Sequence, residues 1–178
     1  MADEEREFDY RIGDFQQVRR LLYERSGISL SDSKEQMVYS RLARRLRALG
    51  LNSFTAYFSH LKQYDEEWQE FVNALTTNLT SFFRESHHFV SLAEHLKKHP
   101  RRNGPVRIWC SAASTGEEPY SLAITAMEAF ASLHPPVQII ASDIDTGVLQ
   151  TAAQGIYPLS RIDQMSNERK KRFFLRGK

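Results

Sequence analysis

The chain has 178 residues, of which 41% are hydrophobic and 26% charged, and its formal net charge is +2. This composition is typical of a globular protein with one ordinary domain or two small ones, and so small a net charge does not by itself indicate a nucleic-acid-binding protein. No apolar run approaches the length of a membrane span, the acidic N-terminus is unlike a signal peptide, and the single cysteine excludes an internal disulfide. We therefore expect a cytoplasmic protein.

Apolar residues recur at helical spacing through the first 75 residues, in four separate runs. Helix-capping residues predict where each helix begins. In chain order they are Asp14, Ser31 or Asp32, Ser53 and Asp65. Gly27 and Gly50 are placed to stop the first two helices. Four short amphipathic helices can bury a small common core, which predicts an N-terminal helical domain.

The second predicted helix is rich in basic residues beside its apolar face. Four of them fall within about a third of the helix circumference. They are Lys34, Arg41, Arg44 and Arg45. One interpretation is an ordinary solvated face, and another is a docking surface for an acidic partner protein. Nucleic-acid binding is weakly supported, because no aromatic residues are interleaved with the basic ones.

The segment at 76–89 has an unusual density of short polar side chains. Thr77, Asn78 and Thr80 can bond either the backbone or a ligand, while two phenylalanines anchor the segment and hold Arg84 beside whatever the segment faces. The alternative is a linker whose polar groups only satisfy turns, with Arg84 in solvent. The adjacent His87 and His88 would not share one face of a helix, so we expect no metal site.

The next stretch is a predicted strand, Val106–Cys110, that runs through a loop of small residues into a helix. The loop and helix start read Ser-Ala-Ala-Ser-Thr-Gly-Glu-Glu-Pro-Tyr-Ser at 111–121. Phosphate-binding loops present bare N–H groups at such a place, but Glu117 and Glu118 would repel a pyrophosphate. The loop favours a ligand with hydroxyl groups or positive charge, although either carboxylate alone could simply complement the helix dipole.

A second predicted strand, Val137–Ser142, ends directly before Asp143, so the strands and the helix between them have the spacing of a βαβ unit. In nucleotide-binding α/β folds, an acidic residue at this place accepts hydrogen bonds from ribose hydroxyls. The dinucleotide fingerprint G-x-G-x-x-G is absent, which counts against NAD or FAD. An adenosine ligand without phosphates fits, and S-adenosylmethionine is the leading candidate. The alternative is that Asp143 only caps the next predicted helix, Thr146–Gln154.

Three motifs resemble those of the CheR-type chemotaxis receptor glutamate O-methyltransferases, in the same order along the chain. They are Asn78-Leu-Thr-Ser-Phe-Phe-Arg84, Ala113-Ser-Thr-Gly-Glu-Glu-Pro-Tyr-Ser121 and Ala141-Ser-Asp-Ile-Asp145. Gly155-Ile-Tyr157 and Phe173-Phe174 also look like family sequence, so the resemblance runs essentially from end to end. It implies transfer of a methyl group from S-adenosylmethionine to glutamate side chains on the cytoplasmic helices of chemoreceptors, with S-adenosylhomocysteine as the product.

The resemblance also implies roles for particular residues. Asn78, Thr80 and Arg84 would contact the cofactor, with Arg84 next to the transferring methyl group as the catalytic residue. Glu118 would contact the methionine end of the cofactor, and Asp143 the ribose hydroxyls. No metal is implied, and the protein would meet a membrane only through its receptors. The residues that would dock on the receptor's acidic helices are Lys34, Arg41, Arg44 and Arg45.

Together these features predict an α + α/β fold. We expect a helical receptor-docking domain at 1–75, a joining segment and helix at 76–104, and the first part of a Rossmann-like S-adenosylmethionine-dependent methyltransferase domain at 105–178. Because such a domain needs a larger sheet than the two obvious strands provide, we expect the chain to be truncated at the C-terminus. The alternatives are a non-catalytic module that binds cofactor or receptor, and a nucleic-acid methyltransferase whose binding would fall steeply with salt.

Overall fold

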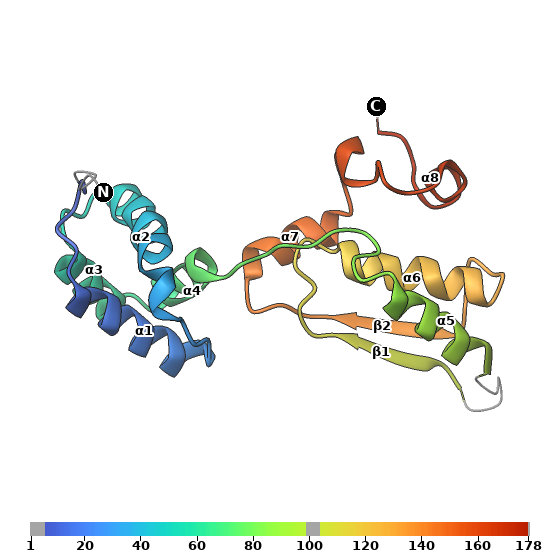
Figure 1. The fold of residues 1–178 in the computed structure, drawn as a ribbon, viewed down its shortest axis with the longest axis horizontal. Helices are drawn as coiled ribbons and strands as arrows, with labels where there is room; N and C mark the ends of the chain where they lie inside the picture. The colour runs from blue at the N-terminus through green and yellow to red at the C-terminus, as the bar shows by residue number, and fades with distance from the viewer. Residues whose placement is uncertain (1–5, 99–103, 178) are drawn as a thin grey trace. The chain divides into compact units, whose positions relative to one another are not determined.

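The computed structural model describes residues 6–98 and 104–177. They divide into two compact units, the first ending at Thr77 and the second beginning at Asn78 (Figure 1). By this division, the expected joining segment at 76–104 falls in the second unit from Asn78 onward. Each unit has its own architecture.

The described part of the first unit, residues 6–77, contains four α-helices and one 3-10 turn. In chain order the elements are α1 (Ile12–Ser26), the turn η1 (Asp32–Lys34), α2 (Glu35–Leu49), α3 (Phe54–Gln63) and α4 (Asp65–Leu75). Helix α1 begins before the expected cap, because Asp14 lies inside its first turn and accepts a hydrogen bond from the backbone N–H of Arg11 at 2.8 Å. Ser53 caps α3 as the sequence predicts, accepting from the N–H of Ala56 at 3.2 Å.

The periodic apolar residues of all four helices meet in one buried cluster. Its largest fully buried side chains are Phe15, Leu22, Leu42, Leu46, Phe54, Tyr57, Leu61 and Phe71. Side chains of this size contribute most of the hydrophobic stabilisation of a small domain, roughly 1.5–3 kcal/mol for each one fully buried. The helical unit therefore has a hydrophobic core of its own.

The second unit combines helices with a two-stranded parallel sheet (Figure 1). In chain order it contains α5 (His87–Lys98), β1 (Val106–Cys110), α6 (Glu117–Ala129), β2 (Val137–Ala141), α7 (Thr146–Gln154), the 3-10 turn η3 (Leu159–Arg161) and α8 (Asn167–Phe173). Helix α6 is the crossover between the strands, and α5 packs beside it. Helix α8 is tied to α6 by a bidentate ion pair between Arg169 and Glu128, with both N–O distances at 2.7 Å.

The two strands pair in register from Val106 opposite Val137 to Cys110 opposite Ala141. Burial alternates along them, because successive side chains of a strand point to opposite faces. Trp109 and its partner Ile140 lie on the open face, with exposed fractions of 72% and 51%. Within the described residues, no helix is both long enough and apolar enough to cross a membrane.

Candidate functional site

The carboxyl ends of the two parallel strands lie at one edge of the sheet, where α/β folds place their ligands. Asp143 follows β2 there, and its carboxylate joins two loops. One oxygen accepts from the N–H of Ser114 at 2.7 Å, and the other from the N–H of Asp145 at 2.9 Å. The cap of α7 is Asp145 rather than Asp143. Asp143 is thus not explained as a helix cap, and each of its oxygens has a second lone pair for another donor.

The two neighbouring glutamates at the start of α6 point to different surroundings. Glu117 is 1% exposed, and one of its oxygens accepts from the Thr115 hydroxyl at 2.6 Å. Glu118 is exposed and lies close to the thiol of Cys110 at the end of β1. Burial, and then the Glu118 carboxylate, raise the pKa of Cys110 to about 11, with a smaller contribution from Asp143. Of the two glutamates, Glu118 is therefore the one available to a ligand at the carboxyl edge.

The joining segment is bonded to this edge at Asn78, the residue at which the second unit begins. The side-chain amide of Asn78 donates to the Asp145 carboxylate at 2.6 Å, and the Ser114 hydroxyl donates to the Asn78 carbonyl at 3.1 Å. The carbonyl of Thr80, two residues further on, accepts from Arg161 at 3.3 Å. These bonds bring the segment that carries Arg84 beside the loops that carry Glu118 and Asp143.

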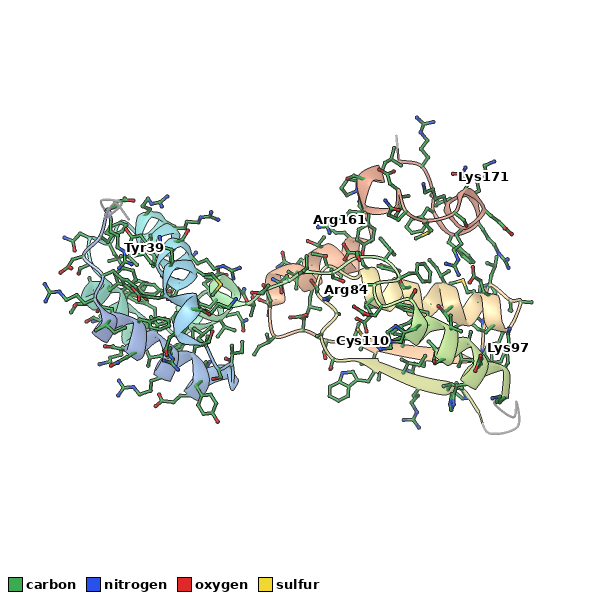
Figure 2. All side chains as sticks on the ribbon, viewed as in Figure 1. Tyr39, Arg84, Lys97, Cys110, Arg161 and Lys171 are labelled. Carbon is green, nitrogen blue, oxygen red and sulfur yellow. The ribbon has the colours of Figure 1, made fainter. Side chains whose placement is uncertain are left out.

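Arg84 lies between two residues with unusual backbone conformations. Phe83 and Glu85 both have φ of 54°, in the left-handed region that non-glycine residues rarely adopt. The Phe83 N–H donates to the Ser121 hydroxyl of α6 at 3.0 Å, and a guanidinium nitrogen of Arg84 donates to the Leu79 carbonyl at 3.3 Å. Backbone strain of this kind persists only where surrounding contacts hold it, and it clusters at functional sites. Figure 2 labels Arg84 on this segment, Cys110 at the end of β1 and Arg161 at the end of η3.

The four basic residues predicted for docking do not form one free surface. Lys34 and Arg44 are exposed. Arg45 instead makes a bidentate ion pair with the buried Glu67 of α4, at 3.0 and 2.6 Å, and Glu67 also accepts from the Tyr57 hydroxyl at 2.9 Å. These bonds connect three helices of the first unit.

Arg41 is also bonded inside the helical unit. Its guanidinium donates to the carbonyl of Ala74 at 3.2 Å and to the carbonyl of Thr76. The last carbonyls of a helix have no partner within it, so Arg41 supplies donors to the C-terminal end of α4. Of the four predicted docking residues, two are thus used in holding α2 against α4.

Several residues at the carboxyl edge were not predicted from the sequence. Asp145 and Tyr157 lie in motifs that the resemblance had already marked, so a signal existed for them. Glu117 was treated together with Glu118, and nothing in the sequence distinguishes the buried carboxylate from the exposed one. Arg161 had no signal at all. In the described ranges, 6–98 and 104–177, no three His, Cys, Asp or Glu side chains are grouped as metal ligands.

A cavity of about 870 Å³ lies elsewhere in the second unit, between α6, the segment at 155–162 and residues 172–177. None of the predicted cofactor residues lines it. Tyr157 lines the cavity, and its hydroxyl donates to the Thr115 carbonyl in the loop before Glu118.

Comparison with known families identifies the family of both parts of the chain. Residues 13–76 match the family described as CheR methyltransferase, all-alpha domain, and residues 78–178 match CheR methyltransferase, SAM binding domain. The chain belongs to the CheR methyltransferase family. The cofactor of the matched domain is S-adenosylmethionine, and the predicted fold, a helical domain followed by part of a Rossmann-like domain, is confirmed.

Curated relatives support the same assignment. The chain is 63% identical over 171 residues to chemotaxis protein methyltransferase 2 of Pseudomonas aeruginosa, covering 96% of this chain and 61% of that protein. It is 53% identical to the chemotaxis protein methyltransferase of Salmonella typhimurium, covering 92% of this chain and 56% of the relative. With the Escherichia coli protein of the same name, identity is 48%, covering 92% and 57%. The chain spans roughly three fifths of the length of these relatives.

Proposed function

We propose that this CheR-family protein transfers a methyl group from S-adenosylmethionine to glutamate side chains of chemoreceptors in the cytoplasm. One observation carries the proposal: Asp143, Glu118 and the strained segment of Arg84 meet at the carboxyl edge of the sheet. The names of the relatives support methyl transfer in chemotaxis.

The residues at the edge fit this cofactor chemically. When bound, S-adenosylmethionine supplies a methyl group carried on a positively charged sulfur. Asp143 would accept from the ribose hydroxyls, and Glu118 would face the cationic methionine end, because carboxylates favour hydroxyl donors and positive charge. Asn78 and Thr80 would complete the wall from the joining segment. Since Asn78 already donates to Asp145, we assign it mainly to holding that segment in place.

The acceptor needs no general base from the protein. A glutamate side chain has an ordinary pKa of about 4.3, so it is already an ionised nucleophile at neutral pH. The protein's task is to exclude water and to align the acceptor oxygen with the methyl group. Arg84 is exposed and held by its strained neighbours, and it would orient the acceptor carboxylate through charge-assisted hydrogen bonds.

For receptor docking, we propose that Lys34, at the end of η1, and Arg44 of α2 contact the acidic partner, because both are exposed. Arg41 and Arg45 would act indirectly, since their bonds to α4 fix the orientation of the helix.

The first experiment is a calorimetric titration of the 178-residue chain with S-adenosylhomocysteine. We expect saturable binding that Asp143→Ala abolishes and that Asp163→Ala, an exposed aspartate of the same unit, leaves unchanged. Equal binding by wild type and Asp143→Ala would contradict the proposed site. Receptor binding by a folded chain that binds no cofactor would instead select the non-catalytic docking module.

A further inference from the structure

The segment that follows α7 contacts both loops of the proposed cofactor site, although no role has been assigned to it. The Tyr157 hydroxyl donates to the Thr115 carbonyl at 2.7 Å, in the loop that leads to Glu118. Four residues later, Arg161 donates to the Thr80 carbonyl at 3.3 Å, in the segment that leads to Arg84. A single short stretch thus bonds the backbone on both sides of the site.

Tyr157 packs against the Thr115–Glu118 loop at Gly116. Gly116 has φ of +100°, and a Cβ placed on it would lie 2.5 Å from the Tyr157 hydroxyl and 2.9 Å from Cβ of Ala152. The hydroxyl therefore fills the space beside Gly116, so the loop cannot move closer to Tyr157. Burial, and then the nearby Glu117, raise the pKa of Tyr157, so its hydroxyl remains a donor at ordinary pH.

Arg161 connects a buried carboxylate with the second loop. Its guanidinium lies 3.5 Å from the Glu117 oxygen that has no hydrogen-bond partner among the described residues. Glu117 is 1% exposed, and burial of a carboxylate is costly unless a cation lies close to it. Arg161 provides the positive charge beside Glu117, and its own side chain is 49% exposed and bonded to the Thr80 carbonyl.

An aromatic contact completes the connection. The ring of Phe82 packs edge-on against Tyr157 with centroids 5.0 Å apart, and edge-on against Phe174 at 5.5 Å. Edge-to-face pairs at this separation are favourable beyond their buried area. Phe82 is two residues from Arg84, so the same tyrosine that supports the Thr115 loop also packs against the segment of the proposed catalytic arginine.

We propose that Tyr157 and Arg161 are positioning residues of the cofactor site. They set the Thr115–Glu118 loop and the Thr80–Arg84 segment at the separation that S-adenosylmethionine requires. Neither touches the reacting atoms, so they act through Glu118, Thr80 and Arg84. The inference rests on the proposed function for its ligand, but the loop geometry that it concerns can be measured without any ligand.

Tyr157→Phe tests the first contact, because it removes only the hydroxyl. Tyr120→Phe is a matched control: the Tyr120 hydroxyl also donates to a backbone carbonyl, that of Ala152 at 3.0 Å, but not in either loop. We expect affinity for S-adenosylhomocysteine to fall about tenfold in Tyr157→Phe and less than twofold in Tyr120→Phe, with similar unfolding midpoints. Equal affinities in the two variants would overturn the role of Tyr157.

Arg161 is tested by rescue and by coupling. We expect Arg161→Ala to weaken S-adenosylhomocysteine binding severalfold, Arg161→Lys to restore part of the loss, and Lys171→Ala on α8 to have no effect. The losses in Arg161→Ala and Glu117→Gln should not add in the double variant, since residues in contact couple. Full additivity would mean that Arg161 acts without Glu117 and would overturn this part.

Hydrogen exchange of the unliganded chain separates this inference from the proposed function. We expect faster exchange at 79–84 and 114–118 in Tyr157→Phe and Arg161→Ala than in Tyr120→Phe and Lys171→Ala. If the wild-type chain binds no S-adenosylhomocysteine, the proposed cofactor site fails, while the exchange comparison still decides whether these residues hold the loops. Unchanged exchange in both loops would overturn the inference.

Discussion

In the helical unit, apolar side chains from all four helices share one buried cluster, and its buried charge, Glu67, is bonded to Arg45 and Tyr57. In the α/β unit, Trp109 and Ile140 lie largely exposed on the open face of a two-stranded sheet, and much of the order comes from hydrogen bonds between loops. The first arrangement favours stability, and the second places exposed charged groups beside strained backbone. The largest buried core and the proposed cofactor site thus lie in different units of the chain.

Leu42→Ala should show the largest effect on stability. Leu42 is fully buried, and a leucine-to-alanine change in such a core costs about 3 kcal/mol of unfolding free energy. Ile140→Ala on the open sheet face should cost less than about 1 kcal/mol. Each unit has one tryptophan, so urea unfolding can be followed by Trp68 after Trp109→Phe, and by Trp109 after Trp68→Phe. Similar losses of unfolding free energy in Leu42→Ala and Ile140→Ala would contradict this difference between the two units.

Arg84→Ala should lower methyl transfer strongly and change stability little. Arg84 is exposed, so its removal should change the unfolding free energy by less than about 0.5 kcal/mol. If the proposed function is right, turnover in a receptor methylation assay should fall about 100-fold, while affinity for S-adenosylhomocysteine should change by less than about threefold. Lys97→Ala, at the exposed end of α5, is the control for loss of a positive charge. Equal turnover in Arg84→Ala and the wild type would remove the catalytic assignment.

Cys110 tests the electrostatics of the carboxyl edge. Its pKa, raised to about 11, leaves the thiolate about a hundredfold scarcer at pH 8 than for a thiol with the ordinary value near 9. We expect iodoacetamide to alkylate this only cysteine at least about tenfold more slowly in the folded chain than in urea, with the rate rising as pH approaches 11. Glu118→Gln should lower the pKa and speed alkylation, and an unchanged rate would mean that Glu118 does not face the thiol.

Arg41→Ala should have the smallest measurable effect. Loss of its bonds to the carbonyls of Ala74 and Thr76 should cost about 1 kcal/mol, whereas Arg44→Ala should stay within about 0.5 kcal/mol. In a receptor-binding assay the order should reverse, with Arg44→Ala causing the greater loss. A greater loss of receptor affinity in Arg41→Ala than in Arg44→Ala would mean that Arg41 contacts the receptor directly.

The sequence predicted the elements well where the signal is local. Apolar periodicity and capping residues located all four helices of the first unit, and β-branched residues located both strands. The start of α1 differed, because Asp14 bonds the backbone from inside the first turn instead of preceding it. Helix α2 begins later than predicted, at Glu35, because Asp32–Lys34 form a 3-10 turn, and the cap of α4 is Tyr64 rather than Asp65.

The parts that the sequence did not predict depend on residues distant along the chain. The spacing of the sequence predicts one helix face for four basic residues, although Lys34 belongs to the turn η1. Only the position of α4 shows that Arg41 and Arg45 are bonded internally. Likewise, Arg161 reaches Thr80 across 81 positions of the sequence, so no pattern within a motif could reveal the contact. The motifs predict a cofactor site at the carboxyl edge, but they do not predict the contacts between its loops.

The two left-handed residues on either side of Arg84 have a practical consequence for protein engineering. Glycine at position 85 would accept φ of 54° without steric cost, whereas glycine at position 83 would also remove the ring that packs against Phe89 and Arg169. At position 85 the relief of strain would come with a looser segment, because glycine also permits conformations that the glutamate now forbids. Substitutions meant to raise stability should therefore start in the helical unit, where they leave the segment of Arg84 unchanged.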